Sequence, residues 1–182
     1  GGHRTMTTPI RSIIRIATKR EEEPYNILTV LGQDQSYYSK LAKTNHNFYY
    51  WENVNKIGWD DSYGMKPENF LSIKTSEPPA HIDFDLVLCL DRSLFQFCKN
   101  FADFYHTSLV LLETIPVEDE LRNHPDFNAI SSIQGDVNVF GGEACRDSWG
   151  QLGYVIEEDD DNFCSSWNNV FSESCSLIYT RV

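Results

Sequence analysis

Short, mostly apolar runs separated by helix-like segments constrain the fold of this chain more than any other feature. Residues 25–31, 84–90 and 108–113 each have the length of a strand, and polar or glycine residues follow them. A strand that is apolar on both faces has to be covered on both faces, as in a parallel sheet flanked by helices. Alternating strands and helices therefore predict an α/β fold with a Rossmann-like parallel sheet.

The other elements of such a fold follow from the same patterns. Further strands are expected over 47–51, 70–74, 137–140 and 154–156, and helices over 34–43, 92–105, 117–133 and 143–149. Residues 52–69, rich in aromatics with glycine and proline, predict a long ordered loop. We expect the four segments 26–31, 84–90, 109–112 and 137–140 to lie adjacent and parallel in one sheet.

The chain divides into three parts. Residues 1–24 are interpreted as a tag remnant ahead of Met6, a basic amphipathic helix over 9–18 and a polar linker. Residues 25–156 form the α/β domain. Residues 157–182 form an acidic tail with a strand at 176–180, and the apolar residues of 163–182 are expected to fold back on the domain or pack against a second copy.

The net charge of −12 argues against a general nucleic-acid binder, which needs a basic surface for phosphates. The charge is unevenly distributed: residues 1–20 hold five basic residues and no acidic one, which leaves 10 basic against 27 acidic residues, or −17, for the rest. An apolar stripe with basic flanks over 9–20 suits weak contact with an anionic membrane surface, an acidic partner, or the chain's own acidic domain.

The cysteines indicate the compartment. Five cysteines without a C-x-x-C spacing predict free thiols in a reducing cytoplasm, with a Cys164–Cys175 disulfide as the less favoured alternative. No zinc-ligand spacing is present, and the basic residues at the start are not followed by the apolar region of a secretory signal.

Few residues carry an obvious chemistry. The sequence contains neither phosphate-binding glycine fingerprint nor a G-x-S-x-G elbow, so we assign no catalytic residue, no metal ligand and no cofactor. Gly141-Gly142 lies between a strand and a helix, which fits an anion site or simply a tight turn. His46 and His81 are candidate bases or structural histidines. The acidic run 157–161 is interpreted as a solvated loop that repels phosphate.

Aromatic residues gather between 48 and 63, with asparagines and aspartates between them. This composition suits either a surface that binds a sugar or a partner, or aromatic packing in the core.

Five motifs occur in an order typical of one family. They are Ile10-Arg11-Ser12-Ile13-Ile14-Arg15, Asn26-Ile27-Leu28-Thr29, Thr44-Asn45-His46-Asn47-Phe48-Tyr49, Asp83-Phe84-Asp85-Leu86-Val87-Leu88, and the run from Gly135 to Phe140 followed by Arg146-Asp147-Ser148-Trp149-Gly150. From about residue 10 to 163 the chain resembles the N-terminal half of a GT-B glycosyltransferase, of the family-4-like type found in phage and marine bacterial genomes. The resemblance implies a single half-domain of the GT-B fold.

The chain departs from the family pattern where the resemblance would place the chemistry. Relatives carry P-T-H-E where this chain has Leu31-Gly32-Gln33-Asp34, and E-H-T-x-P where it has Glu113-Thr114-Ile115-Pro116. Their V-I-H-H-G-I-D turn corresponds here to Val155-Ile156 followed by five carboxylates, and their second Rossmann domain has no counterpart. The resemblance therefore implies a catalytically degenerate domain.

Such a domain is expected to act by binding a glycan, a nucleotide or nucleotide-sugar, or a partner protein, including a homodimer formed through the tail. The alternatives are the acceptor-binding half of an active glycosyltransferase that needs a second domain, and a structural or assembly protein of a phage, located in the host cytoplasm. Ligands of open α/β sheets bind beyond the carboxyl ends of the strands. The candidate ligand-binding residues are Gly32, Gln33, Asp34, His46, Asp91, Thr114, Gly141 and Gly142.

Overall fold

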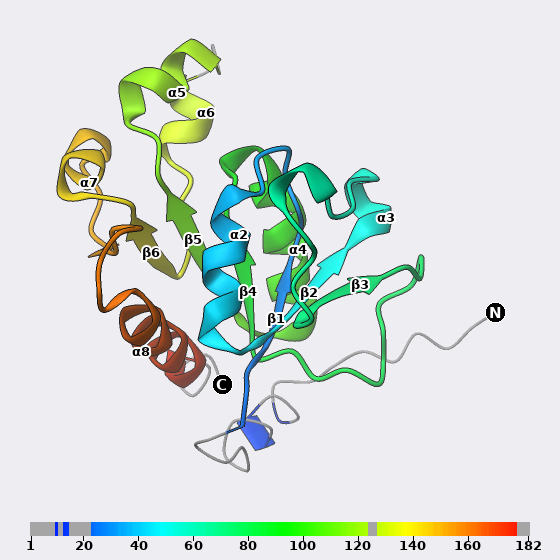
Figure 1. The fold of residues 1–182 in the computed structure, drawn as a ribbon. Helices are drawn as coiled ribbons and strands as arrows, with labels where there is room; N and C mark the ends of the chain where they lie inside the picture. Colours follow the sequence, from blue (N-terminus) through cyan, green and yellow to red (C-terminus); the bar gives the residue numbers. More distant parts are fainter. Residues whose placement is uncertain (1–9, 11–12, 15–22, 124–126, 178–182) are drawn as a thin grey trace.

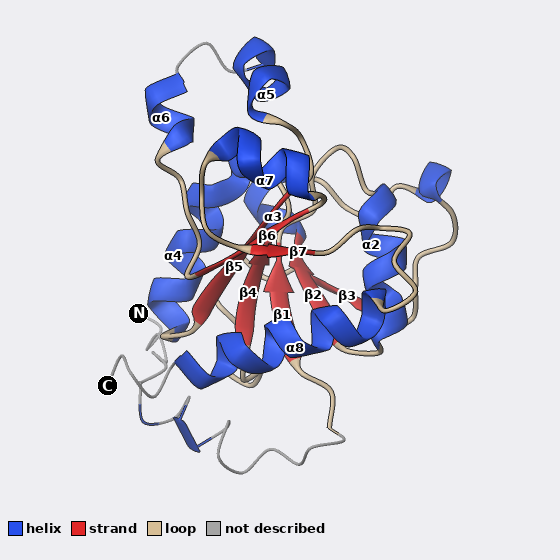
Figure 2. Ribbon diagram, turned by 90° about the vertical axis from the view of Figure 1, so that its left-hand side faces the viewer, coloured by secondary structure: helices blue, strands red, loops and turns tan. Residues whose placement is uncertain are grey.

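The computed structural model describes residues 10, 13–14, 23–123 and 127–177 and contains one sheet of seven strands (Figures 1 and 2). The strands are β1 (Asn26–Thr29), β2 (Asn47–Trp51), β3 (Phe70–Ile73), β4 (Leu86–Cys89), β5 (Ser108–Glu113), β6 (Val137–Phe140) and β7 (Tyr154–Val155). Every neighbouring pair is parallel, and the order is β3-β2-β1-β4-β5-β6-β7. The predicted Rossmann-like α/β fold is confirmed, as is the adjacent, parallel placement of β1, β4, β5 and β6.

Helices cover both faces of this sheet. They are α2 (Ser36–Leu41), α3 (Glu52–Asn55), α4 (Phe95–Tyr105), α5 (Val117–Asn123), α6 (Phe127–Ser131), α7 (Glu143–Trp149) and α8 (Phe163–Ser176), with short 3-10 turns η1 (Ala42–Thr44), η2 (Asp61–Tyr63) and η3 (Arg92–Leu94). One face packs against α2 and α8, and the other packs against α3 and α4. Figure 2 shows α8 running across the strands. Among the described residues no helix is both long and apolar enough to cross a bilayer.

The strand pattern explains why two separate core layers form. In β4, Leu86 and Leu88 belong to the layer beneath α2 and α8, whereas Val87 and Cys89 belong to the layer beneath α4. All four side chains are buried, because successive residues of a strand point to opposite faces and both faces are covered. The aromatic run of β2 follows the same rule: Phe48, Tyr50 and Trp51 are core residues. Core packing is therefore the role of these three.

The tail differs from its predicted form. Residues 163–176 are helical, and Ser176 ends α8 at the position where a strand was expected to begin. Residues 178–180 of that expected strand lie outside the described residues. Phe163, Trp167, Val170 and Phe171 are buried at helical spacing against the sheet. The serines and asparagines of this segment are weak helix formers, but burial of one apolar face outweighs propensity. The expectation that this segment folds back on the domain is confirmed for residues 163–177.

Two further segments are only partly described. Ile10, Ile13 and Ile14 are helical, whereas the rest of the helix expected over 9–18 lies outside the described residues. Within the segment 117–133, which was expected to be mostly helical, residues 117–123 (α5) and 127–131 (α6) are helical, and residues 124–126 lie outside the described residues.

Candidate ligand-binding cleft

A cleft of about 290 Å³ lies beyond the carboxyl ends of β1, β4 and β5. The strand order reverses between β1 and β4, since the chain proceeds from β1 to one side of the sheet and from β4 to the other. Such a reversal leaves a crevice in open α/β sheets. Four of the predicted residues line this cleft: Gly32, Asp34, Asp91 and Thr114.

Two aspartates stand at the cleft with their orientation set by local hydrogen bonds. Asp91 Oδ1 accepts from the backbone N–H of Ser93 (2.9 Å) and from its hydroxyl (2.7 Å). Asp34 Oδ1 accepts in the same way from Ser36, at 3.1 and 2.8 Å. An aspartate that bonds two residues ahead forms a tight turn. The loops that follow β1 and β4 thus each hold one carboxylate beside the cleft.

Arg92 and Glu113 form a buried ion pair in the wall of the cleft. Arg92 Nε lies 2.6 Å from Glu113 Oε1, and the two side chains are 1% and 7% exposed. Arg92 Nη1 also donates to the carbonyl oxygens of Ile130 (3.2 Å) and Ile133 (2.9 Å), and the guanidinium carbon lies 3.9 Å from the ring centroid of Trp149. The hydrogen-bonding groups of the Arg92 guanidinium are therefore bound to other groups of the same protein.

The electrostatic character of the cleft is acidic. Five carboxylates line it, from Asp34, Asp91, Glu113, Glu120 and Glu158, against the single guanidinium of the buried pair. Burial raises the pKa of Glu113, and the adjacent guanidinium offsets this rise only in part. Across the described residues, no three His, Cys, Asp or Glu side chains come together as metal ligands.

The remaining predicted residues lie outside the lining. Gln33 is exposed next to the cleft, and Gly141 sits behind Thr114, where a Cβ atom would come within 3.2 Å of the threonine methyl group. Gly142 is the residue before α7. Close packing against β5 is thus the observed role of Gly141.

His46 lies at the opposite, amino end of the sheet, immediately before β2. Its Nδ1 accepts from the backbone N–H of Tyr25 (3.0 Å), and its Nε2 lies 2.6 Å from Asn168 Oδ1. The ring also packs edge-on against Phe171. The structure places His46 as a link between β2 and α8, far from the carboxyl ends of the strands.

Sequence reasoning missed several residues of the cleft. Gln35 does not line the cleft but supports it from behind. Its buried side chain donates to the carbonyl oxygens of Gly32 (3.2 Å) and Gly58 (3.0 Å) and accepts from the backbone N–H of Asp60 (2.9 Å), so it ties the loop after β1 to the loop after α3. Arg92 and Glu113 were also missed as a pair. A charged residue at the end of each of two neighbouring buried strands is the signal that could have identified that pair.

The cleft therefore has the position of a ligand site in a Rossmann-like fold and a carboxylate-rich lining. No protein-family model, no curated protein and no solved structure matches this chain, so its resemblance to glycosyltransferases depends on the sequence motifs alone.

Proposed function

We propose that this domain binds a neutral, hydroxyl-rich ligand such as a glycan in the cleft, and that it does not transfer a sugar by itself. The single observation that carries the proposal is the carboxylate lining of the cleft. Glu113 is paired with Arg92 and Glu158 with Lys40 (3.1 Å), and among the described residues the lining holds no second cation for the carboxylates of Asp34 and Asp91. Carboxylate oxygens accept hydrogen bonds from sugar hydroxyls, and such charge-assisted bonds are stronger than neutral ones. Glycan binding by the acceptor side also agrees with the family resemblance.

The same lining disfavours a nucleotide-sugar. A carboxylate and a phosphate charge 4 Å apart repel each other by about 1 kcal/mol in water and by about 4 kcal/mol at a protein surface. A diphosphate carries several such charges, and stabilisation of a leaving diphosphate requires donors or cations aimed at it. The guanidinium of Arg92 is held by Glu113 and two carbonyl oxygens, so it is not available for this purpose.

The alternative function is the acceptor-binding half of a two-domain enzyme, which would use the same cleft. One observation favours independent binding. The apolar face of α8, including Trp167 and Phe171, covers the sheet with this chain's own residues. Burial of that face therefore requires no second domain.

Saturation-transfer NMR tests the proposal with the methyl glycosides of glucose, galactose, mannose and N-acetylglucosamine, alongside uridine and guanosine diphosphate. We expect at least one glycoside to bind and both diphosphates to fail. Asp91→Asn should weaken the binding of that glycoside by about tenfold, since a hydrogen bond to a charged group contributes about 1.5–3 kcal/mol. Asn retains the acceptor for Ser93, so the turn survives.

The matched control is Asp60→Asn. Asp60 precedes η2 and accepts from the backbone N–H of Ser62 (2.9 Å), as Asp91 does from Ser93, but it does not line the cleft. This variant should bind the glycoside like the wild type. Tighter binding of uridine diphosphate than of any glycoside, or turnover of uridine diphosphate glucose by the isolated chain, would refute the proposal.

A further inference from the structure

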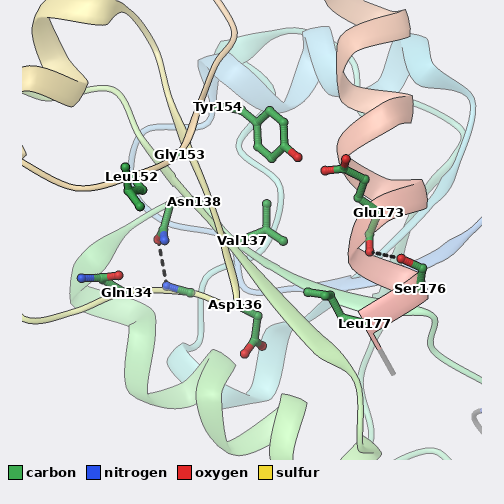
Figure 3. A pocket seen from close by; sticks show the side chains of 11 residues that line it. Gln134, Asp136, Val137, Asn138, Leu152, Gly153, Tyr154, Glu173, Ser176 and Leu177 are labelled. Carbon is green, nitrogen blue, oxygen red and sulfur yellow. Dashed lines mark hydrogen bonds between the residues drawn. The ribbon is translucent and has the colours of Figure 1, made fainter. Parts of the chain in front are cut away.

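A second hollow lies at the opposite end of the sheet, between the amino ends of β6 and β7 and the last turn of α8. This groove beside β7 has a volume of about 720 Å³, is open to solvent, and includes Val137, Leu152, Tyr154 and Leu177 in its lining. Figure 3 shows Val137 between Tyr154 and Leu177 in that view. The groove shares no residue with the cleft at the carboxyl ends.

The groove leaves apolar surface exposed at the edge of the sheet. Leu152 is 93% exposed and Tyr154 is 43% exposed. Tyr154 is in register with Val139, so its side chain lies on the sheet face that α8 covers over β4 and β5. A smaller hollow of about 400 Å³, lined by Tyr154, Ile156 and Val170, continues the apolar surface between β7 and α8.

The rim of the groove is acidic. Asp136 and Glu173 line it from opposite sides, one before β6 and one on α8, and both are exposed. Figure 3 shows Glu173 beside Tyr154 and Asp136 below Val137. A segment with apolar side chains between basic ones would match both the apolar lining and the acidic rim of the groove.

The N-terminal segment of the chain has that composition. Ile10 and Ile14 are helical positions that are 66% and 56% exposed, and their spacing of four in the sequence is that of one face of an amphipathic helix. In the sequence Arg11 and Arg15 stand directly beside them, and no acidic residue occurs before Glu21. Neither isoleucine lines the groove of its own chain.

We propose that the segment around Ile10 and Ile14 of one copy docks into the groove beside β7 of a second copy. Reciprocal exchange of two identical segments gives a closed two-fold dimer, which is the commonest symmetry for such a contact. Apolar burial provides the attraction, and the acidic rim with Arg11 and Arg15 sets the orientation. The groove shares no lining residue with the carboxyl-end cleft, so dimer formation and the proposed glycan binding can be tested separately.

Sedimentation velocity of the full chain over a range of concentrations tests the proposal. We expect a monomer–dimer equilibrium that weakens as salt is raised. Ile14→Asp should abolish the dimer, and Glu173→Lys should weaken it by about tenfold. Combining Glu173→Lys with Arg15→Glu should restore it, because the charges are then exchanged. Glu68→Lys, an equal charge change on an exposed residue before β3 at the other edge of the sheet, should have no effect beyond that of net charge.

A photo-crosslinker at position 14 identifies the contact in a mixture of isotope-labelled and unlabelled chains. Crosslinks between chains to residues 134–138, 152–154 or 173–177 would support the proposal. A monomer at all concentrations, crosslinks confined within one chain, or failure of the charge exchange to restore the dimer would overturn it. Binding of position 14 to anionic vesicles in place of self-association would equally overturn it, in favour of a membrane surface.

Discussion

Replacement of Arg92 by methionine should destabilise the domain strongly at neutral and alkaline pH. The substitution removes the partner of Glu113 and two hydrogen bonds to carbonyl oxygens of the α6 region. It leaves a carboxylate that is 7% exposed and close enough to Glu120 for mutual repulsion. Removal of one partner of a buried pair costs about 3–5 kcal/mol, because the remaining charge is unpaired. This is a large part of the ~5–15 kcal/mol that stabilises an ordinary domain.

The loss should depend on pH with a definite sign. Burial already raises the pKa of Glu113 above its ordinary value of 4.5 in spite of Arg92, so the folded state binds that proton more tightly than the unfolded chain does. The associated stability is present below pH 4.5 and is lost as pH rises through the folded-state pKa. Without Arg92 the pKa of Glu113 rises further, so the pH range in which protonated Glu113 stabilises the folded state extends to higher pH. Arg92→Met should therefore cost less at pH 5 than at pH 8.

Urea unfolding followed by tryptophan fluorescence at pH 5 and pH 8 measures this difference. Arg92→Met combined with Glu113→Met should recover most of the loss, since no buried charge then remains unpaired. Lys99→Met is the control: Lys99 pairs with Asp103 on the surface of α4, and its loss should cost less than about 0.5 kcal/mol. A loss below about 1 kcal/mol for Arg92→Met at pH 8, or the same loss at both pH values, would refute the reasoning.

Three further predictions concern packing and thiol reactivity. Trp167→Ala should cost about 3–5 kcal/mol in urea unfolding because the indole is fully buried, and truncation after Asp161 should abolish cooperative unfolding by uncovering the sheet. Gly153→Ala should cost about 1–3 kcal/mol, since its Cβ would lie 2.6 Å from a backbone oxygen of β6, whereas Gly142→Ala, with open space around it, should be neutral within about 0.5 kcal/mol. A thiol reagent should label the native protein fastest at Cys164, because the other four cysteines are buried; equal labelling of two or more would contradict the described packing.

The sequence determined the sheet and the place of the cleft. Mostly apolar runs such as 84–90 can be buried only between two layers, and this requirement alone predicts a parallel sheet with helices on both faces. Residues directly after such strands, among them Asp91 and Thr114, must meet at one edge because all strands point the same way. The alternation of side chains between the two faces of a strand and the direction of the chain along it are local properties, so they can be deduced without coordinates.

Only the tertiary structure decided what the cleft contains and how the core is closed. The ion pair of Arg92 with Glu113 joins residues 21 positions apart, and the contact of His46 with Asn168 joins residues 122 apart, so no local pattern reveals either. The segment from Phe163 to Ser176 is a helix in spite of its weak helix propensity, because its apolar face is buried against strands that lie much earlier in the sequence. Pairings between distant residues depend on how the layers pack, and that packing is a property of the whole fold.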